Sequence, residues 1–254
     1  MAVSPILAVG EPTAVPSGTS ETDPALHLRT QFLRRVAHDI ASPTGVTLTV
    51  LEELANAERP RPELVAMARR SLRRLMRLSE HLALVAELES GTLEPEPSVV
   101  DMRTLVKQGL DDAVAIDGRK DVVAACDLPS QPLVAFGDQR LLQVVVREVI
   151  GNALKLASSR VEVSLKQDGE RVVLRVDDDG PGFPEEARAT LGRRFVRRSS
   201  ARGLGLSLSM ATEILDGHGG DLAIDTSALP PGRRGTTGSA VIVTLPMRDA
   251  AAAR

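Results

Sequence analysis

The chain has 254 residues and a net charge of −3, from 31 basic and 34 acidic side chains that are mixed along its length. Without an excess of one charge, and with only 2% aromatic residues, the sequence argues against nucleic acid as a partner. A single cysteine, Cys126, excludes an internal disulfide and fits a reducing cytoplasm, and no apolar run is long enough to span a membrane.

The first third of the chain predicts a disordered segment followed by a helical hairpin. Residues 1–23 are rich in Pro, Ser, Thr and Gly, a composition typical of disorder. Apolar residues then recur every three or four positions, which predicts helices from Pro24 to about Asn56 and from about Pro62 to Glu89. One hairpin cannot cover both apolar stripes, so we expect residues 24–92 to form a dimeric four-helix bundle with a second copy.

The rest of the chain predicts a second, mixed domain. Residues 93–100 are typical of a linker, and helix and strand patterns alternate beyond it. Helices are expected at 101–116, 138–157 and 204–215, and strands at 122–126, 133–136, 161–166, 171–176, 221–225 and 239–245. This order predicts an α/β two-layer sandwich over residues 101–247, with a tail at 248–254, and an α+β fold overall.

Three segments of the second domain carry residue types suited to a nucleotide. Glu148 and Asn152 are four residues apart in DQRLLQVVVREVIGNALK, so they share a helix face where two oxygen ligands suit Mg²⁺. In VDDDGPGF, Asp178 can accept from an exocyclic amine, and the glycines after it let a flat ligand approach the backbone. The GLGL segment, Gly203–Leu206, opens a helix whose N–H groups can face phosphate.

In this order, the three segments resemble the ATP-binding domain shared by histidine kinases, Hsp90, type II topoisomerases and MutL, over about residues 101–247. The resemblance implies ATP and Mg²⁺ as cofactors, with Asn152 on the metal, Lys155 at the phosphates and Asp178 at adenine. It also assigns nucleotide-binding roles to the glycines of the first box, to the element before a basic lid at 184–202, and to the second glycine box: Gly180, Gly182, Phe195, Arg197, Gly203, Leu204, Gly205 and Leu206.

The sequence departs from that family at two positions. Glu148 stands where kinases usually have the first asparagine of a pair, and it can either bind Mg²⁺ or activate water, as a glutamate there does in Hsp90-type ATPases. Ala201 replaces the usual first glycine of the second glycine box. His218, in a His-Gly-Gly turn, is expected to have a structural role.

The first helix carries a second chemical signal in FLRRVAHDIASP, residues 32–43. His38 has a nitrogen that can accept a phosphoryl group, and the adjacent Asp39 can orient its ring or take its proton. The segment resembles the histidine box of dimerising histidine kinases, in which a polar residue four positions on, here Ser42, helps to position water for dephosphorylation of the partner.

Together, the two resemblances imply an ATP-dependent protein histidine kinase of the sensor type. It would be a homodimer that phosphorylates His38 and passes the phosphoryl group to an aspartate in the receiver domain of a response regulator. A separate sensory protein is a candidate source of the input. Two alternatives stay open: a nucleotide-binding pseudo-kinase scaffold, and a hydrolysing ATPase that uses Glu148.

Overall fold

The computed structural model describes residues 24–57, 59, 61–117, 119, 121–183, 207–232 and 235–247. Several predictions concern residues outside these ranges: the disordered segment at 1–23, the tail at 248–254, and the lid with Phe195, Arg197 and Ala201. The GLGL segment, Gly203, Leu204, Gly205 and Leu206, also lies outside the described residues.

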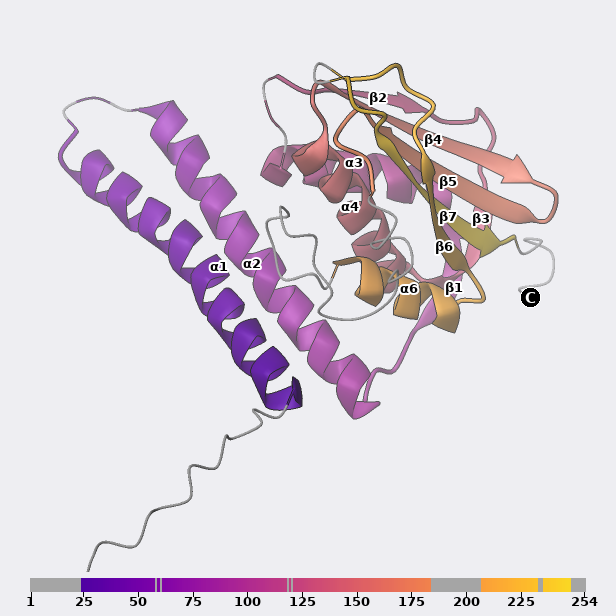
Figure 1. Ribbon diagram of the computed structural model, residues 1–254, viewed down its shortest axis with the longest axis horizontal. Coiled ribbons are helices and arrows are strands. Elements are labelled where there is room, and N and C mark those ends of the chain that lie inside the picture. The colour runs from indigo at the N-terminus through magenta and orange to yellow at the C-terminus, as the bar shows by residue number, and fades with distance from the viewer. Residues whose placement is uncertain are drawn as a thin grey trace, which may run out of the picture.

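The predicted hairpin is present as two long antiparallel helices, α1 (Pro24–Ala55) and α2 (Pro62–Ser90) (Figure 1). Pro62 begins α2 at a position where its missing N–H costs nothing, and Gly91 ends it with a φ of 66°. Pro43 lies inside α1, which is continuous. Among the described helices, none is both long and apolar enough to cross a bilayer.

The predicted sandwich is confirmed in the described residues between 97 and 247, with helices on one face of a five-stranded sheet (Figure 1). The sheet order is β2-β4-β5-β7-β6, in which only β2 and β4 are parallel. Its strands are β2 (Val123–Asp127), β4 (Arg160–Asp168), β5 (Arg171–Asp178), β6 (Asp221–Thr226) and β7 (Ser239–Pro246). The described helices of this domain are α3 (Met102–Asp117), α4 (Gln139–Leu156) and α6 (Ser207–Gly217).

A further strand, β1 (Pro97–Asp101), pairs with β3 (Val134–Asp138) in a separate antiparallel sheet. The linker predicted at 93–100 is therefore wrong over 97–100, which belongs to the second domain. The pattern was missed because three of the five residues of β1 are exposed, so no alternation of apolar and polar residues marks it.

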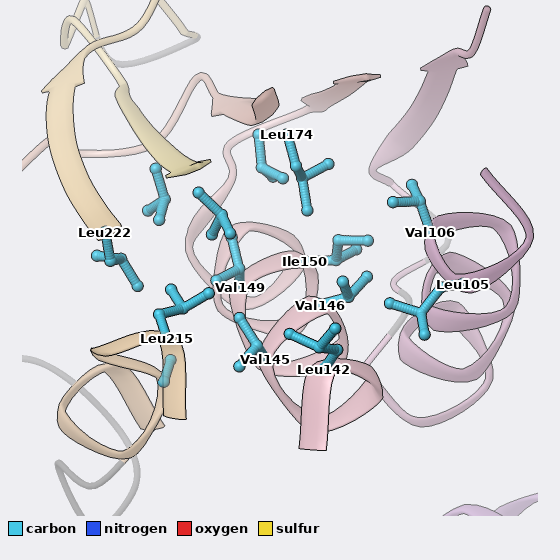
Figure 2. Close-up of a cluster of buried hydrophobic side chains, with 14 of the residues drawn as sticks. Leu105, Val106, Leu142, Val145, Val146, Val149, Ile150, Leu174, Leu215 and Leu222 are labelled. Carbon is cyan, nitrogen blue, oxygen red and sulfur yellow. The ribbon is translucent and has the colours of Figure 1, made fainter. Parts of the chain in front are cut away.

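Helix α4 is the centre of the second domain's core (Figure 2). Its buried valines and Ile150 pack between α3, α6 and the inner face of the sheet. Gly109 of α3 lets the two helices approach closely, because a Cβ there would lie 2.6 Å from a methyl carbon of Val146. This packing fixes α4, and with it every residue of the predicted Mg²⁺ and phosphate site on that helix.

Candidate nucleotide-binding site

Asp178 lies at the end of β5 and is only 3% exposed. Its Oδ2 accepts a hydrogen bond from the Ser239 hydroxyl at 2.6 Å, and its Oδ1 accepts one from the Gly180 N–H at 2.8 Å. Burial raises the pKa of Asp178 above its ordinary value, although the bonds from Ser239 and Gly180 oppose the rise. The carboxylate is therefore held in one orientation, as a fixed acceptor for an amine must be.

The two aspartates beside Asp178 have structural partners. Asp177 accepts hydrogen bonds from Nε and Nη2 of the Arg175 guanidinium, at 2.8 and 3.0 Å, and one from the Ala228 N–H. Asp179 accepts the N–H groups of three successive residues, 158–160, at 2.8 to 3.0 Å. These bonds tie the end of β5 to the loop after α4, so Asp177 and Asp179 have structural roles, and Asp178 stays the aspartate predicted to bind a ligand.

The glycines of the first box are required by close backbone contacts. A Cβ on Gly180 would lie 2.4 Å from the Leu156 carbonyl oxygen, and Gly182 has a φ of 73°. A hydrogen bond from the Thr236 hydroxyl to the Gly180 carbonyl, at 2.8 Å, joins this box to the segment before β7. The box is therefore built from two parts of the chain that are far apart in the sequence.

Sequence reasoning missed the role of Ser239, which it treated only as the start of the last strand. In the antiparallel pairing of β5 and β7, Ser239 lies directly opposite Asp178. A hydroxyl at the first position of that strand is a signal only when the register is known, because many strands begin with Ser or Thr.

Helix α4 supplies the residues predicted for metal and phosphate. Its N-cap is Asp138, whose Oδ1 accepts the N–H groups of Arg140 at 2.8 Å and Leu141 at 3.1 Å. Asn152 is partly exposed, and the Lys155 ammonium lies 3.6 Å from Oδ2 of Asp117 on α3. Burial lowers the pKa of Lys155, and the charge of the nearby Arg77 lowers it further.

Glu148 has surroundings different from those of Asn152. It is 2% exposed, and its Oε1 lies 2.9 Å from His81 Nε2 in an ion-pair contact that is not aligned as a hydrogen bond. Arg77 Nε and Arg147 Nε are each 4.0 Å away. Burial alone would raise the pKa of Glu148, but the charges of His81 and Arg77 outweigh it, so the pKa is lowered. In this arrangement the carboxylate faces α2.

The phosphoacceptor candidate lies apart from these residues. The His38 side chain is 80% exposed, and its Nδ1 lies 3.1 Å from Asp39 Oδ1. A neutral ring that donates from Nδ1 keeps its lone pair on Nε2, which is the form a nucleophile needs. Ser42, one helical turn on, is also exposed. Helix α2 lies between α1, which carries His38, and the second domain, which carries Asp178 (Figure 1).

His218 has the structural role expected of it. Its Nδ1 donates to the Ile214 carbonyl at 2.6 Å, and its Nε2 accepts the Asp138 N–H at 3.0 Å. The ring therefore links the end of α6 to the start of α4, and both of its nitrogens are occupied. Gly137 makes room for it, because a Cβ there would lie 2.4 Å from a ring carbon.

Comparison with known proteins gives a consistent result. Residues 137–249 match the family described as "Histidine kinase-, DNA gyrase B-, and HSP90-like ATPase". The chain is 30% identical to the signal transduction histidine-protein kinase AfsQ2 of Streptomyces coelicolor, over 78% of this chain and 39% of that protein. It is 31% identical to the probable sensor histidine kinase TcrY of Mycobacterium tuberculosis, over 78% of this chain and 43% of that protein.

Among solved structures, the mycobacterial sensor histidine kinase MprB matches with a TM-score of 0.52 and 31% identity. That match covers 59% of this chain and 99% of the solved one. The chain thus spans about two-fifths of the length of the curated relatives, 39% and 43%, and nearly all of the solved structure.

Proposed function

Because the chain belongs to the family of sensor histidine kinases, we propose that it binds ATP with Mg²⁺ in its second domain and transfers the γ-phosphoryl group to His38. The observation that carries the proposal is that the two domains of one chain hold the two kinds of residue that the reaction needs. In the second domain, Asp178 is buried beside the glycines of the first box and is held in one orientation. On α1, His38 is exposed and its Nδ1 contacts Asp39.

The residues of the second domain suit the binding of ATP. Asp178 accepts the exocyclic amine of adenine, and its fixed orientation selects a donor at that position. The Lys155 ammonium holds phosphate oxygens, and the side-chain oxygen of the partly exposed Asn152 is a ligand of the kind that Mg²⁺ prefers. Bound Mg²⁺ supplies positive charge to the phosphate oxygens.

The reacting atom of the protein is Nε2 of His38. Its lone pair forms a bond to the γ-phosphorus, and the bond from that phosphorus to the β–γ bridging oxygen breaks, so ADP leaves with the electron pair. Asp39 holds the Nδ1 proton and stabilises the positive charge that develops on the ring. Since α2 lies between α1, which carries His38, and the second domain, the phosphoryl group reaches His38 only if the second domain moves relative to the hairpin or acts on a second copy of the chain.

The proposed partners follow from family membership. A second copy of the chain completes the helical bundle, and a response regulator accepts the phosphoryl group on an aspartate of its receiver domain. Ser42 is the residue proposed to position water for the reverse, dephosphorylating role. The alternative of a hydrolysing ATPase loses support from the surroundings of Glu148, whose carboxylate is enclosed by His81, Arg77 and Arg147.

Incubation with ATP labelled at the γ-phosphorus tests the proposal. The wild-type protein should take up label that is labile in acid and stable in base, and His38→Gln should abolish it while calorimetry shows nearly unchanged ATP binding. His27→Gln, on the same helix, is the matched control and should label normally. Label that persists on His38→Gln would identify another acceptor. Absence of label on the wild type, with ATP bound, would favour the pseudo-kinase scaffold.

A further inference from the structure

The five-stranded sheet ends at β2 on one side, and the outer edge of that strand is open. β2 pairs in parallel with β4, and no further strand lies beyond it in the described part of the chain (Figure 1). The Val123 N–H donates to the Ser159 carbonyl at 2.8 Å, so the backbone polar groups of Val123 face the side of β4. Since successive residues of a strand direct these groups to opposite sides, those of Ala124 and Cys126 face outward.

This edge lacks the features that usually protect an open strand. Proteins place charged side chains, proline or a bulge on such edges, or cover them with other parts of the chain. Residues 123–126 are Val-Ala-Ala-Cys, without charge or proline, and their register with β4 is regular. The Val123 residue is 68% exposed. An open edge of this kind can accept an added strand from a partner.

Helix α3 lies beneath the inner side of the edge. Ala124 packs partly against the core, so Ala124 and Cys126 are the side chains of β2 that point toward the helices. Burial raises the pKa of the Cys126 thiol, and the nearby charges of Asp127 and Asp111 raise it further, which places Asp111 of α3 close to the edge. Val114, on the same side of α3 three residues on, is 45% exposed. A strand added to β2 would therefore lie over these two residues of α3.

The charges around the edge favour a basic occupant. Two acidic side chains, Asp121 and Glu162, each form an ion pair with a neighbouring arginine. Asp127 and Asp111 form none with any described residue. A second copy of the chain would bring the same two carboxylates to this edge and be repelled, whereas lysine or arginine side chains are attracted.

From these observations we propose that the outer edge of β2 is a docking site for an extended, basic segment of a partner protein, which adds to the sheet as a further strand. Its backbone bonds to the outward N–H and C=O groups of β2, and its side chains alternate between the two faces of the sheet. On the inner face they meet Asp111 and Val114, and on the outer face they meet Asp127 and Val123. Basic side chains pair with the two aspartates, and apolar ones cover the two valines.

The docking site lies beside the nucleotide box without using its residues. Ser159, which accepts the Val123 N–H, donates from its own N–H and hydroxyl to Asp179, the neighbour of Asp178. A partner on β2 is therefore separated from Asp178 by one loop. Since the edge holds no residue of the proposed reaction, docking can be measured on a protein that binds ATP normally.

A synthetic peptide tests the docking on the full chain. The probe is fluorescently labelled Lys-Val-Lys-Val-Lys-Val with blocked ends. One control has glutamate in place of lysine, and the other is the lysine peptide with every backbone nitrogen methylated, which keeps the charges and has no N–H to donate. Fluorescence anisotropy should show about tenfold or tighter binding of the probe than of either control. In amide exchange measured by NMR, the N–H groups of Ala124 and Cys126 should exchange about tenfold or more slowly with the probe bound.

Variants of the chain separate the contribution of the backbone from that of charge. Ala124→Pro removes one outward N–H at an edge position that tolerates proline, and it should weaken probe binding by about tenfold. Asp127→Lys should weaken it by about threefold or more and strengthen binding of the glutamate peptide. Asp168→Lys, at the exposed end of β4, is the matched control and should bind the probe as the wild type does. Unchanged ATP binding reports that each variant is folded, and the methylated peptide tests the backbone contact without any change in the protein.

Several outcomes would overturn the docking site. They include no binding of the probe, and binding that leaves the exchange of Ala124 and Cys126 unchanged. Equal affinity for the methylated peptide would show attraction by charge without an added strand. Protection of the Cys126 thiol from maleimide by a higher protein concentration alone would show that a second copy of the chain occupies the edge. None of these measurements depends on labelling of His38, so failure of the proposed kinase function is distinguishable.

Discussion

The helical hairpin and the second domain differ in how completely each buries its own apolar residues. Ile150 and Val149 of α4 are 0% exposed, whereas Leu48 of α1 and Met76 of α2 are 58% and 65% exposed. Other large apolar side chains of the hairpin are also exposed: Leu33, Ile40, Val46, Leu51, Val65, Met67 and Leu72. The sandwich buries its apolar residues in a core of its own, whereas many large apolar side chains of the hairpin stay exposed. We therefore expect the hairpin, and not the second domain, to need a second copy of the chain to cover its apolar residues.

Separation of the two regions is the strongest test of this difference. Residues 20–95 should form a helical dimer, because association removes the exposed apolar faces from water at roughly 25 cal/mol per Å². Residues 93–250 should be a monomer that still binds ATP. This fragment has to include Glu96, whose N–H donates to Asp138 Oδ2, and the strand β1 that follows it. Light scattering on both fragments decides, and a folded, monomeric 20–95 fragment would refute the bundle.

Substitution of one apolar residue in each region sharpens the comparison. Ile150→Ala should lower the free energy of unfolding of the 93–250 fragment by about 2–5 kcal/mol, because it leaves a cavity in a closed core. Leu48→Ala should instead weaken dimerisation of the 20–95 fragment, by about 1.5–3 kcal/mol per buried leucine. Urea unfolding and dilution-dependent light scattering measure the two effects. Val123→Ala, exposed on the edge strand β2, is the control and should change neither.

A third test concerns the nucleotide box of the self-contained domain. Asp178→Asn should weaken ATP binding by about 1.5–3 kcal/mol, since it replaces a charged acceptor with an amide, and it should lower the selectivity for ATP over GTP. Asp168→Asn, at the exposed end of β4, is the matched control. Calorimetric titration with unchanged affinity and selectivity for Asp178→Asn would show that this aspartate does not read adenine.

The smallest expected effect is at the start of α4. Asp138→Ala should lower the free energy of unfolding of the 93–250 fragment by about 0.5–2 kcal/mol, the usual cost of a lost N-cap. Burial would raise the pKa of Asp138, but hydrogen bonds from Glu96, Leu141 and Arg140 lower it overall.

A lowered folded pKa means that the carboxylate stabilises the fold fully above its unfolded pKa of about 4. That contribution is lost as pH falls through the lowered folded value. The stability difference between wild type and Asp138→Ala should therefore be present at pH 7 and shrink below about pH 4. A difference independent of pH in urea unfolding would show that the charge of Asp138 is not involved.

Local pattern was sufficient for most of the secondary structure. The predicted helix at 138–157 is observed as Gln139–Leu156, and the predicted strand at 171–176 is observed as Arg171–Asp178. Helix periodicity and strand alternation are properties of neighbouring residues, so they can be read without the rest of the fold. β1 was missed because its strand has no such alternation and is defined by its pairing with β3.

The choice among neighbouring polar residues needed the tertiary structure. Sequence chemistry proposed Asp178, but only the fold shows that Asp177 is taken by Arg175 and Asp179 by the backbone of residues 158–160. Ser239 lies 61 residues after Asp178, and only the register of β5 and β7 places it opposite that aspartate.

Glu148 and Asn152 show the limit of sequence reasoning most clearly. Their spacing determined that they share a helix face, because four residues make about one turn. It could not determine what packs on that face, since Arg77, His81 and Asp117 come from two other helices. The sequence by itself determined which residue types suited to nucleotide binding and phosphoryl transfer the chain carries. Only the tertiary structure shows that α2 lies between α1, with His38, and the second domain, because long-range contacts between helices leave no local periodic signal.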